Sequence, residues 1–340
     1  MPLICTLNGG CMKYLKIAAV FLVISALTAN ISYAEAKKGK IKVGVSVATM
    51  KEAVYSFMKK AMMDNKDKYN AEIYWVAANN DEMAQVANVE DLLAQGIDVL
   101  ILHPVNTVAA GSLVEKARKE NVPVISMDRL PVNANVNCHV TANSFLVGQT
   151  QAKYLAEKLN GKGNVVILEG ESGNDVAKEI TAGNKDILKN YPGMKIVVDQ
   201  THKSWSRDLA MATTENALTN YKNDIQGISA NNSGMIMGAV QAILAEGLKG
   251  KIITVGSDAD KDSCQAIIDG TNSADVDKMP YQLGLISFQV AVSIAKGAEI
   301  ESDAMVQNGK YKVPVKFTPV RLITKENVKE MKDRWPDLKF

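Results

Sequence analysis

The chain has 340 residues, of which 47% are hydrophobic and 22% are charged. This composition is that of a soluble globular protein, not of a disordered or fibrous one, and the length favours two packed lobes. Thirty-nine basic residues stand against 37 acidic residues, and this formal net charge of +2 is too balanced for a nucleic-acid footprint or a polybasic membrane surface. We therefore expect a small ligand and no nucleic-acid partner.

The first 34 residues differ from the rest of the chain. Lys13 and Lys16 precede a short apolar run, and small residues follow it up to Ala34. This order is typical of a secretory signal peptide, and the apolar run is shorter than the roughly 20 residues of a transmembrane helix. We predict a signal peptide over residues 1–34, cleaved near Ala34, with a non-native extension over residues 1–11. The exported chain would be formally neutral and would lie in the periplasm.

Cysteine and histidine usage gives no sign of a metal site. Beyond the predicted signal peptide, Cys138 falls in a strand-like segment and Cys264 in a helix-like segment. Their wide separation favours two free buried thiols, with a disulfide as the alternative. The three histidines are scattered and lack the spacing of metal ligands. We expect neither a metal nor a cofactor.

Short β-rich runs alternate with longer helical patterns from residue 41 onward, which predicts parallel sheets built from βαβ units. Near-continuous apolar runs such as residues 99–102 indicate strands covered by helices on both faces. The predicted strands form two series, over residues 41–47, 72–78, 99–105, 123–127 and 138–142, and then over residues 164–170, 195–200, 227–230, 251–258 and 274–278.

Between the strands, apolar residues recur at three- and four-residue spacing, as expected for helices with one face on a core. These helices are predicted over residues 83–95, 147–159, 208–219, 234–245 and 284–296. Residues 301–318 have weaker periodicity. A short terminal helix is predicted over residues 325–335, with Thr324 as its cap.

Polar residues stand just past the ends of several predicted strands. In open α/β sheets, ligands bind beyond the carboxyl ends of the strands, and two facing lobes would bring these ends to one cleft. Carboxylate, amide and guanidinium groups can bind sugar hydroxyls, while an aromatic ring can pack against the C–H face of a sugar. The sequence thus predicts a sugar-binding cleft formed by Asp128, Arg129, Asn143, Asn174, Asp175, Trp205, Asn231, Asn232 and Asp258.

The order of these motifs resembles that of the ribose- and xylose-binding periplasmic proteins over nearly the whole chain after residue 34. The Asp128-Arg129 pair, the Gly-x-Asp-Ala-Asp stretch that ends at Asp260 and the Gln-Ala-Lys run at Gln151 are most similar to the xylose-binding branch. The motifs that carry the resemblance are residues 45–46, 125–129, 141–143, 204–207, 231–232, 255–260 and 278–284.

This resemblance implies a type I periplasmic binding protein, with two doubly wound parallel-sheet α/β lobes joined by a three-segment hinge. It implies that the lobes close on a monosaccharide, a pentose such as xylose being favoured, with no catalysis. The expected partners are the membrane permease of an ABC transporter and, in addition, a chemoreceptor, and the protein is expected to be a monomer. The lobes would comprise residues 38–142 with 279–303 and residues 143–278 with 304–340, and the hinge crossings would lie near residues 142–145, 276–281 and 302–316.

The resemblance also implies residue roles. Asp128 and Arg129 would bind sugar hydroxyls from the first lobe, and Asn232 and Asp258 would do so from the second. Trp205 would stack on the sugar face. The remaining candidates are Asn143 and Lys278 at the lobe crossovers, and Asp175 and Lys178 after the sixth strand.

Two departures from the family pattern matter. The loop after the first strand lacks the usual asparagine or arginine pattern, so Lys51 and Tyr55, with Glu52, are candidates by place alone. In addition, Asn232 is followed by Ser233 where the family has an acid. The loss of that acid leaves both a neutral pentose and an anionic ligand open.

Each candidate also has a purely structural interpretation. Asp128 and Arg129 could form an internal ion pair, and Asn232 and Asp258 could cap helices. Trp205 could be a packed aromatic residue at the edge of a sheet, and the lysines could be solvated surface charges.

Other protein classes fit the sequence less well. An oxidoreductase would need Gly-x-Gly-x-x-Gly where residues 45–50 read Val-Ser-Val-Ala-Thr-Met. A sugar-responsive regulator would need a DNA-binding headpiece where the export signal lies, and a hydrolase would need a Gly-x-Ser-x-Gly elbow. Within the binding class, the alternative ligands are another polyol, a deoxy-sugar, an inositol or a sugar acid. A more distant alternative is a sensor domain that feeds a chemoreceptor or a histidine kinase.

Overall fold

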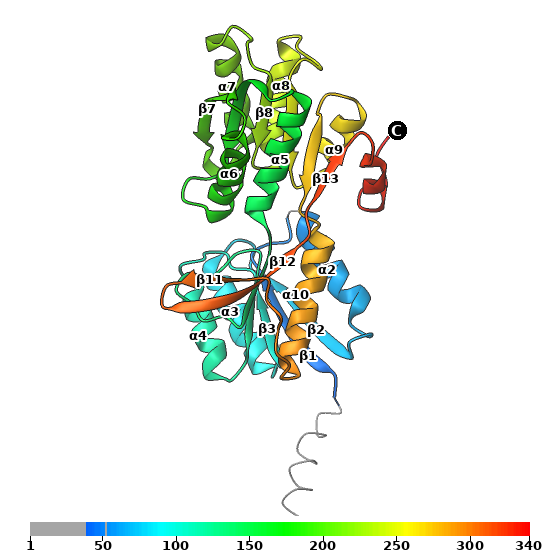
Figure 1. Cartoon of the computed structure of the whole chain (residues 1–340). Helices are drawn as coiled ribbons and strands as arrows, with labels where there is room; N and C mark the ends of the chain where they lie inside the picture. Colours follow the sequence, from blue (N-terminus) through cyan, green and yellow to red (C-terminus); the bar gives the residue numbers. More distant parts are fainter. Residues whose placement is uncertain (1–38, 52) are drawn as a thin grey trace, which may run out of the picture.

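The computed structural model of the chain describes residues 39–51 and 53–340, so the predicted signal peptide lies outside the described residues. These residues form two α/β lobes, stacked one above the other in Figure 1. This arrangement confirms the predicted fold class. No helix in the described part of the chain is long and apolar enough to span a membrane.

The lower lobe in Figure 1 is built on a seven-stranded sheet with the order β11-β12-β5-β4-β3-β1-β2. All neighbours in this sheet are parallel except β11, which pairs antiparallel with β12. Its strands are β1 (Ile41–Val47), β2 (Ala71–Ala77), β3 (Val99–Leu102), β4 (Val124–Met127), β5 (Cys138–Ala142), β11 (Ala304–Asn308) and β12 (Tyr311–Thr318). One face is covered by α2 (Ala53–Asn65) and α10 (Pro280–Ala295), and the other by α3 (Glu82–Ala94) and α4 (Gly111–Lys119).

The upper lobe contains a six-stranded sheet with the order β13-β10-β9-β8-β6-β7, in which only β13 is antiparallel to its neighbour. Its strands are β6 (Lys162–Glu169), β7 (Gly193–Thr201), β8 (Gly227–Ala230), β9 (Ile253–Ser257), β10 (Ala274–Asp277) and β13 (Arg321–Thr324). The faces are covered by α5 (Ser144–Lys158) and α6 (Asp175–Leu188), and by α7 (Arg207–Asn220) and α8 (Ser233–Ala245). The remaining elements are η1 (Lys203–Trp205), α9 (Lys261–Ile268) and the terminal η2 (Val328–Asp333).

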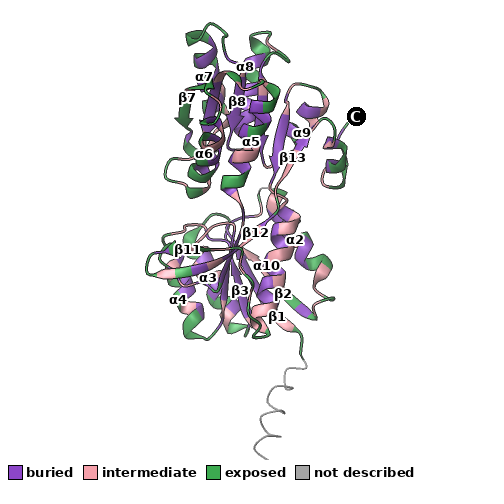
Figure 2. Ribbon diagram, viewed as in Figure 1, coloured by how far each residue is buried: buried purple, intermediate pink, exposed green. Residues whose placement is uncertain are grey.

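Burial explains why the strand predictions succeed. Figure 2 shows the strands as the buried centre of each lobe, and all four residues of β3 are buried because helices cover both of its faces. The ten predicted strands are all present, with ends shifted by a few residues. Helix packing is equally specific, since a Cβ on Gly148 of α5 would lie 1.8 Å from the Ile180 carbonyl oxygen of α6.

The C-terminal part of the chain differs from the prediction. Residues 304–318 were expected in the second lobe, but they form the hairpin β11–β12, and β12 pairs with β5 in the first lobe's sheet. Of the last 37 residues, only those from β13 onward join the second lobe. The third crossing between the lobes therefore lies between β12 and β13, at residues 318–321, and not at 302–316. The terminal helix predicted over residues 325–335 is the shorter 3-10 turn η2.

Candidate ligand-binding cleft

A cleft with a volume of about 2000 Å³ lies between the lobes and is lined by residues of both. Its walls include polar side chains that follow β4 and β5 in the first lobe, and β7, β8, β9 and β10 in the second. Nine of the eleven candidate residues line this cleft, namely Tyr55, Asp128, Arg129, Asn143, Asp175, Trp205, Asn232, Asp258 and Lys278. Lys51 and Lys178 are not among the lining residues.

On the first-lobe side, Asp128 is held in place by a histidine. It follows β4 with a φ of 65°, and its Oδ2 lies 3.2 Å from Nε2 of His103. The imidazole is buried, and it packs edge-on against the ring of Tyr55 at a centroid distance of 5.1 Å. Tyr55 therefore contributes to the site by orienting the histidine that fixes the Asp128 carboxylate.

The charged neighbours of Asp128 favour the ionised form of its carboxyl group. Burial alone would raise its pKa, but the hydrogen bond and charge of His103, together with Arg129 and Lys278, lower the pKa of Asp128 well below its ordinary value. The neighbouring guanidinium of Arg129 contacts the Pro104 carbonyl oxygen, with Nη1 at 3.5 Å. The first lobe thus presents an ionised acceptor beside a planar donor.

On the second-lobe side, two consecutive asparagines have different roles. Asn231 is fully buried, and its Nδ2 donates to the Ala177 carbonyl and to Thr181, tying β8 to α6. Asn232 lines the cleft, and its Oδ1 accepts a 2.8 Å hydrogen bond from the Met235 backbone N–H. Asn232 therefore caps α8, and the same residue also lines the cleft.

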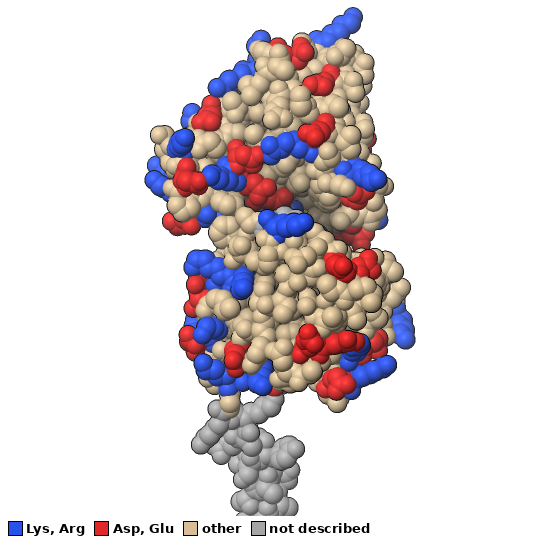
Figure 3. Space-filling view, turned by 180° about the vertical axis from the view of Figure 1, so that it is seen from behind, with Lys and Arg blue, Asp and Glu red and all other residues tan. Residues whose placement is uncertain are grey.

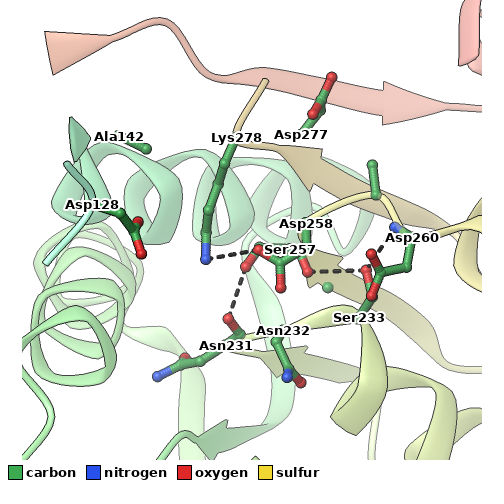
Figure 4. A network of polar contacts seen from close by, with 12 residues as sticks. Asp128, Ala142, Asn231, Asn232, Ser233, Ser257, Asp258, Asp260, Asp277 and Lys278 are labelled. Carbon is green, nitrogen blue, oxygen red and sulfur yellow. Dashed lines mark hydrogen bonds and ion pairs between the residues drawn. The ribbon is translucent and has the colours of Figure 1, made fainter. Parts of the chain in front are cut away.

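Lys278 and Asp258 form an ion pair at the junction of the lobes. Nζ of Lys278 lies 2.8 Å from Oδ1 of Asp258, and Figure 4 shows the lysine side chain between Asp128 of the first lobe and Asp258 of the second. Burial alone would lower the pKa of Lys278, but the carboxylates of Asp258 and Asp128 raise it above its ordinary value. The lysine is therefore a charged link between acidic groups of both lobes.

Asp258 does not cap the helix that follows it. The N-cap position of α9 is occupied by Asp260, whose side chain also lines the cleft. Burial, together with the neighbouring carboxylates of Asp258 and Asp262, raises the pKa of Asp260 to about 7. Burial likewise raises the pKa of Asp258.

Trp205 closes the second-lobe wall with an indole ring fixed by close packing. Ser204 and Trp205 have φ values of 54° and 55°, and this unusual backbone turns the ring over Gly170. A Cβ at Gly170 would lie 2.4 Å from the indole, so only glycine leaves room for it. The ring is half-buried against the second-lobe core and also lines the cleft.

Residues 43–299 match the family model described as the periplasmic binding protein domain. The chain belongs to this family. A D-xylose-binding periplasmic protein of Haemophilus influenzae is 29% identical over 316 residues, which covers 92% of this chain and 94% of that protein. The family resemblance inferred from the motifs is thereby confirmed.

Solved structures of other binding proteins have the same two-lobed fold. A solute-binding protein of an ABC transporter from Bacillus halodurans, with bound myo-inositol, has a TM-score of 0.73 at 29% identity and covers 88% of this chain and 99% of its own. One from Actinobacillus succinogenes, with bound D-allose, has a TM-score of 0.73 at 27% identity and covers 86% and 100%. Both of these relatives are solute-binding proteins of ABC transporters, and this chain shares their fold.

Some candidate residues lie at the rim of this binding protein's cleft or away from it. Asp175 and Lys178 form an exposed ion pair of 3.2 Å on the first turn of α6, with side chains 85% and 63% exposed. Lys51 is an exposed loop residue, and Glu52 lies outside the described residues. Asn143 caps α5 at the first lobe crossing, where its Oδ1 accepts from the Leu146 N–H at 2.9 Å.

The sequence reasoning missed two acid–base groups of the cleft region. His103 directly follows β3 in the structure, but it lies inside the strand predicted over residues 99–105, so the strand-end rule did not select it. Asp260 ends the Gly-x-Asp-Ala-Asp motif but was not selected as a site residue. Both were passed over because their significance comes from burial beside other charges, which the sequence does not display.

The two cysteines of the described chain are free and buried, as expected. Cys138 belongs to β5 of the first lobe and Cys264 to α9 of the second. Burial raises the pKa of the Cys138 thiol to about 11, which keeps it protonated. Both thiols therefore act as core residues.

Proposed function

We propose that this chain is the periplasmic substrate-binding protein of a sugar ABC importer, which captures one neutral monosaccharide or related polyol between its lobes. The observation that carries the proposal is the convergence of Asp128 and Arg129 from one lobe with Asn232, Asp258 and Trp205 from the other on a single cleft. Carboxylate and guanidinium groups supply paired hydrogen bonds to ring hydroxyls, and the indole supplies a face for C–H groups.

The charge of the cleft supports an uncharged ligand over a sugar acid. Eight acidic residues line it, against four basic ones, and the basic Lys278 is already paired with Asp258. A ligand carboxylate would meet this excess of negative charge at short range. The related proteins with xylose, myo-inositol and allose in their descriptions also take uncharged polyhydroxylated ligands. Among these, we favour a pentose such as xylose because of the motif order.

Capture requires the lobes to move. Pockets that enclose small molecules usually measure roughly 300–1,000 Å³, whereas this cleft has about 2000 Å³. Three chain crossings connect the lobes, between β5 and α5, between β10 and α10 and between β12 and β13. Rotation about these crossings would bring the second-lobe wall onto a sugar held by the first lobe.

Within this proposal the candidate residues take different roles. Asp128, Arg129, Asn232 and Asp258 bind hydroxyls, and Trp205 stacks on the sugar. Asn143 and Lys278 stand at the crossings, where they contact the ligand in the closed form. Tyr55 acts through His103, while Asp175, Lys178 and Lys51 are rim residues with a minor contribution.

The partners and location follow from the proposed role. The chain would be exported through its signal peptide and work in the periplasm as a monomer. Its closed form would be recognised by a membrane permease and, in addition, by a chemoreceptor. On the face shown in Figure 3, Lys and Arg lie among Asp and Glu on both lobes, around a broad area without charged residues in the middle of the lower lobe, so this face does not resemble a surface for a polyanionic partner.

A thermal-shift panel tests the proposal. D-Xylose, D-ribose, D-allose, myo-inositol and D-glucuronate are added separately, and a ligand that binds only the folded state stabilises it by RT ln(1 + [L]/Kd), which is about 2.7 kcal/mol at a hundredfold excess over Kd. We expect at least one neutral member to raise the melting temperature and D-glucuronate to leave it unchanged. Stabilisation by D-glucuronate alone, or by no member, contradicts the proposal.

A further inference from the structure

The turn that carries Asp258 has a backbone conformation that its residues do not favour. Asp258 and Ala259 follow β9 with φ values of 102° and 52°, in the left-handed region, and neither residue is glycine. Such a conformation persists only where the surroundings hold it. The position of a proposed ligand-binding carboxylate therefore depends on what surrounds this turn.

The N–H groups of the turn are held within the second lobe itself. The Asp258 N–H donates to the Val276 carbonyl at 2.8 Å, and the Ala259 N–H donates to Oδ1 of Asp275 at 3.0 Å. The Asp260 N–H donates to Oγ of Ser233 at 3.2 Å. These partners belong to β10 and to the first turn of α8.

The carbonyl groups of the turn are held by the C-terminal segment that follows η2. Nη1 of Arg334 donates to the Asp258 carbonyl at 3.1 Å and to the Ala259 carbonyl at 3.4 Å. Nε1 of Trp335 donates to the Ala259 carbonyl at 3.0 Å. The second terminal nitrogen of Arg334 forms an ion pair with buried Asp277, so the planar guanidinium joins the turn to the end of β10.

The same two side chains touch the first lobe. The Arg334 guanidinium lies 5.7 Å from the ring centroid of Phe57 in α2, and the Trp335 ring packs edge-on against Phe57 at 5.3 Å. The C-terminal segment thus contacts the Asp258 turn on one side and α2 on the other. A movement of α2 relative to the second lobe would therefore change the contacts of these two side chains.

We propose that Arg334 is a positioning residue of the ligand site: it fixes the turn that presents Asp258 and, with Trp335, connects this turn to α2 of the other lobe. The proposal rests on the proposed function only in taking Asp258 as a ligand-binding residue. A lysine cannot replace this arginine, because one ammonium group lacks the fork that reaches Asp277 and the turn carbonyls together.

The test compares Arg334 with a matched arginine. Arg321 also pairs with Asp277, at 3.4 Å, but its other partners are Glu330 and the Met331 sulfur and not the turn. The variants are R334K, R334Q and R321Q, of which R334K keeps the positive charge beside Asp277 and is the safest for folding. Hydrogen–deuterium exchange of a peptide over residues 256–262 reports on the turn without any ligand, and calorimetric titration with the five-member sugar panel reports on binding.

We expect R334K and R334Q to accelerate exchange in this peptide at least tenfold and to weaken binding of the stabilising sugar at least tenfold, with R321Q within threefold of the wild type in both. Equal effects of R334Q and R321Q, or R334K indistinguishable from the wild type, would overturn the positioning role. If the wild type binds no member of the panel, the proposed function fails, and the exchange measurement still decides the role of Arg334 in holding the turn.

Discussion

The two walls of the cleft use the same residue type in opposite electrostatic settings. In the first lobe, Asp128 lies beside His103 and Arg129, and its pKa is lowered. In the second lobe, Asp258, Asp260 and buried Asp275 lie close to one another, and the pKa of each is raised. The first wall therefore offers a fixed negative acceptor, while the second offers carboxyl groups whose charge depends on pH and on the neighbouring Lys278 and Arg334.

The largest expected loss of sugar affinity comes from removing the charged side chains of the first-lobe wall. D128A and R129A should each weaken sugar binding by more than about a hundredfold, since hydrogen bonds to charged groups contribute about 1.5–3 kcal/mol each and the pair makes several. The ligand-free R129A protein should keep its melting temperature, whereas ligand-free D128A should stay folded but melt at a lower temperature, because it loses the contact between the carboxylate and His103. Calorimetric titration and thermal melting measure the two quantities, and R118A, in exposed α4, is the control. Loss of the folded state in either variant would show that the pair is structural.

The free energy of unfolding should depend on pH in opposite directions for the carboxyl groups of the two lobes. Because burial raises the folded-state pKa of Asp275 to about 7, the native state binds more protons than the unfolded state between pH 4 and 7. Relative to D275N, the wild type should therefore lose free energy of unfolding as pH rises through this window, by up to about 1.4 kcal/mol per pH unit.

Asp128 should show the reverse sign. Its folded-state pKa is lowered, so its contribution is present above pH 4 and is lost as pH falls below that value. Relative to D128N, the wild type should lose stability only on the acid side. Urea unfolding from pH 3 to pH 8 measures the free energy of unfolding of the wild type and of both variants. The difference between wild type and variant should fall with rising pH for D275N and rise with pH for D128N. Changes of the same sign in the two differences would contradict the contrast between the walls.

The indole of the second wall gives an effect of intermediate size. G170A places a Cβ within 2.4 Å of the Trp205 ring and should displace it, with a loss of about 1–3 kcal/mol in stability and about tenfold in sugar affinity. G234A is a suitable control, because a Cβ there meets its nearest side-chain atom at an ordinary 3.6 Å. Unchanged affinity in G170A would mean that Trp205 packs the lobe without touching the sugar.

The rim of the second lobe should matter least. Lys178 and its partner Asp175 are exposed, and exposed ion pairs contribute about 0–1 kcal/mol. K178A should therefore change sugar affinity by less than about threefold in calorimetric titration. A loss of affinity greater than tenfold would mean that Lys178 contacts the sugar in the closed form, which contradicts its assignment to the rim.

The sequence predicted the fold where burial is uniform along an element. Strands such as β3 are apolar throughout, so their pattern identifies them without knowledge of the partners. The hairpin β11–β12 was missed because β11 is an edge strand in which the first four residues are alternately half-buried and exposed, and its one buried residue is the polar Asn308. Its place beside β5 also depends on a pairing between residues more than 170 positions apart, which no local pattern displays.

The candidate site was predictable to the extent that it follows strand ends. Asp128, Asn232 and Asp258 were found in this way, and all three line the cleft. The rule carries no information on contacts from other segments. Arg334 lies 76 residues from Asp258 in a terminal turn without sheet periodicity, and its hydrogen bonds to the turn exist only in the folded chain.

The most direct test of the central claim is a crystal structure of the complex with the neutral sugar that stabilises the protein most. The account predicts one sugar molecule between the lobes, with hydroxyls bound to Asp128 or Arg129 on one side, to Asn232 or Asp258 on the other, and with Trp205 against its face. The lobes should lie closer together than in the open cleft described above. A sugar bound to one lobe alone, or at a site outside this cleft, would contradict the account.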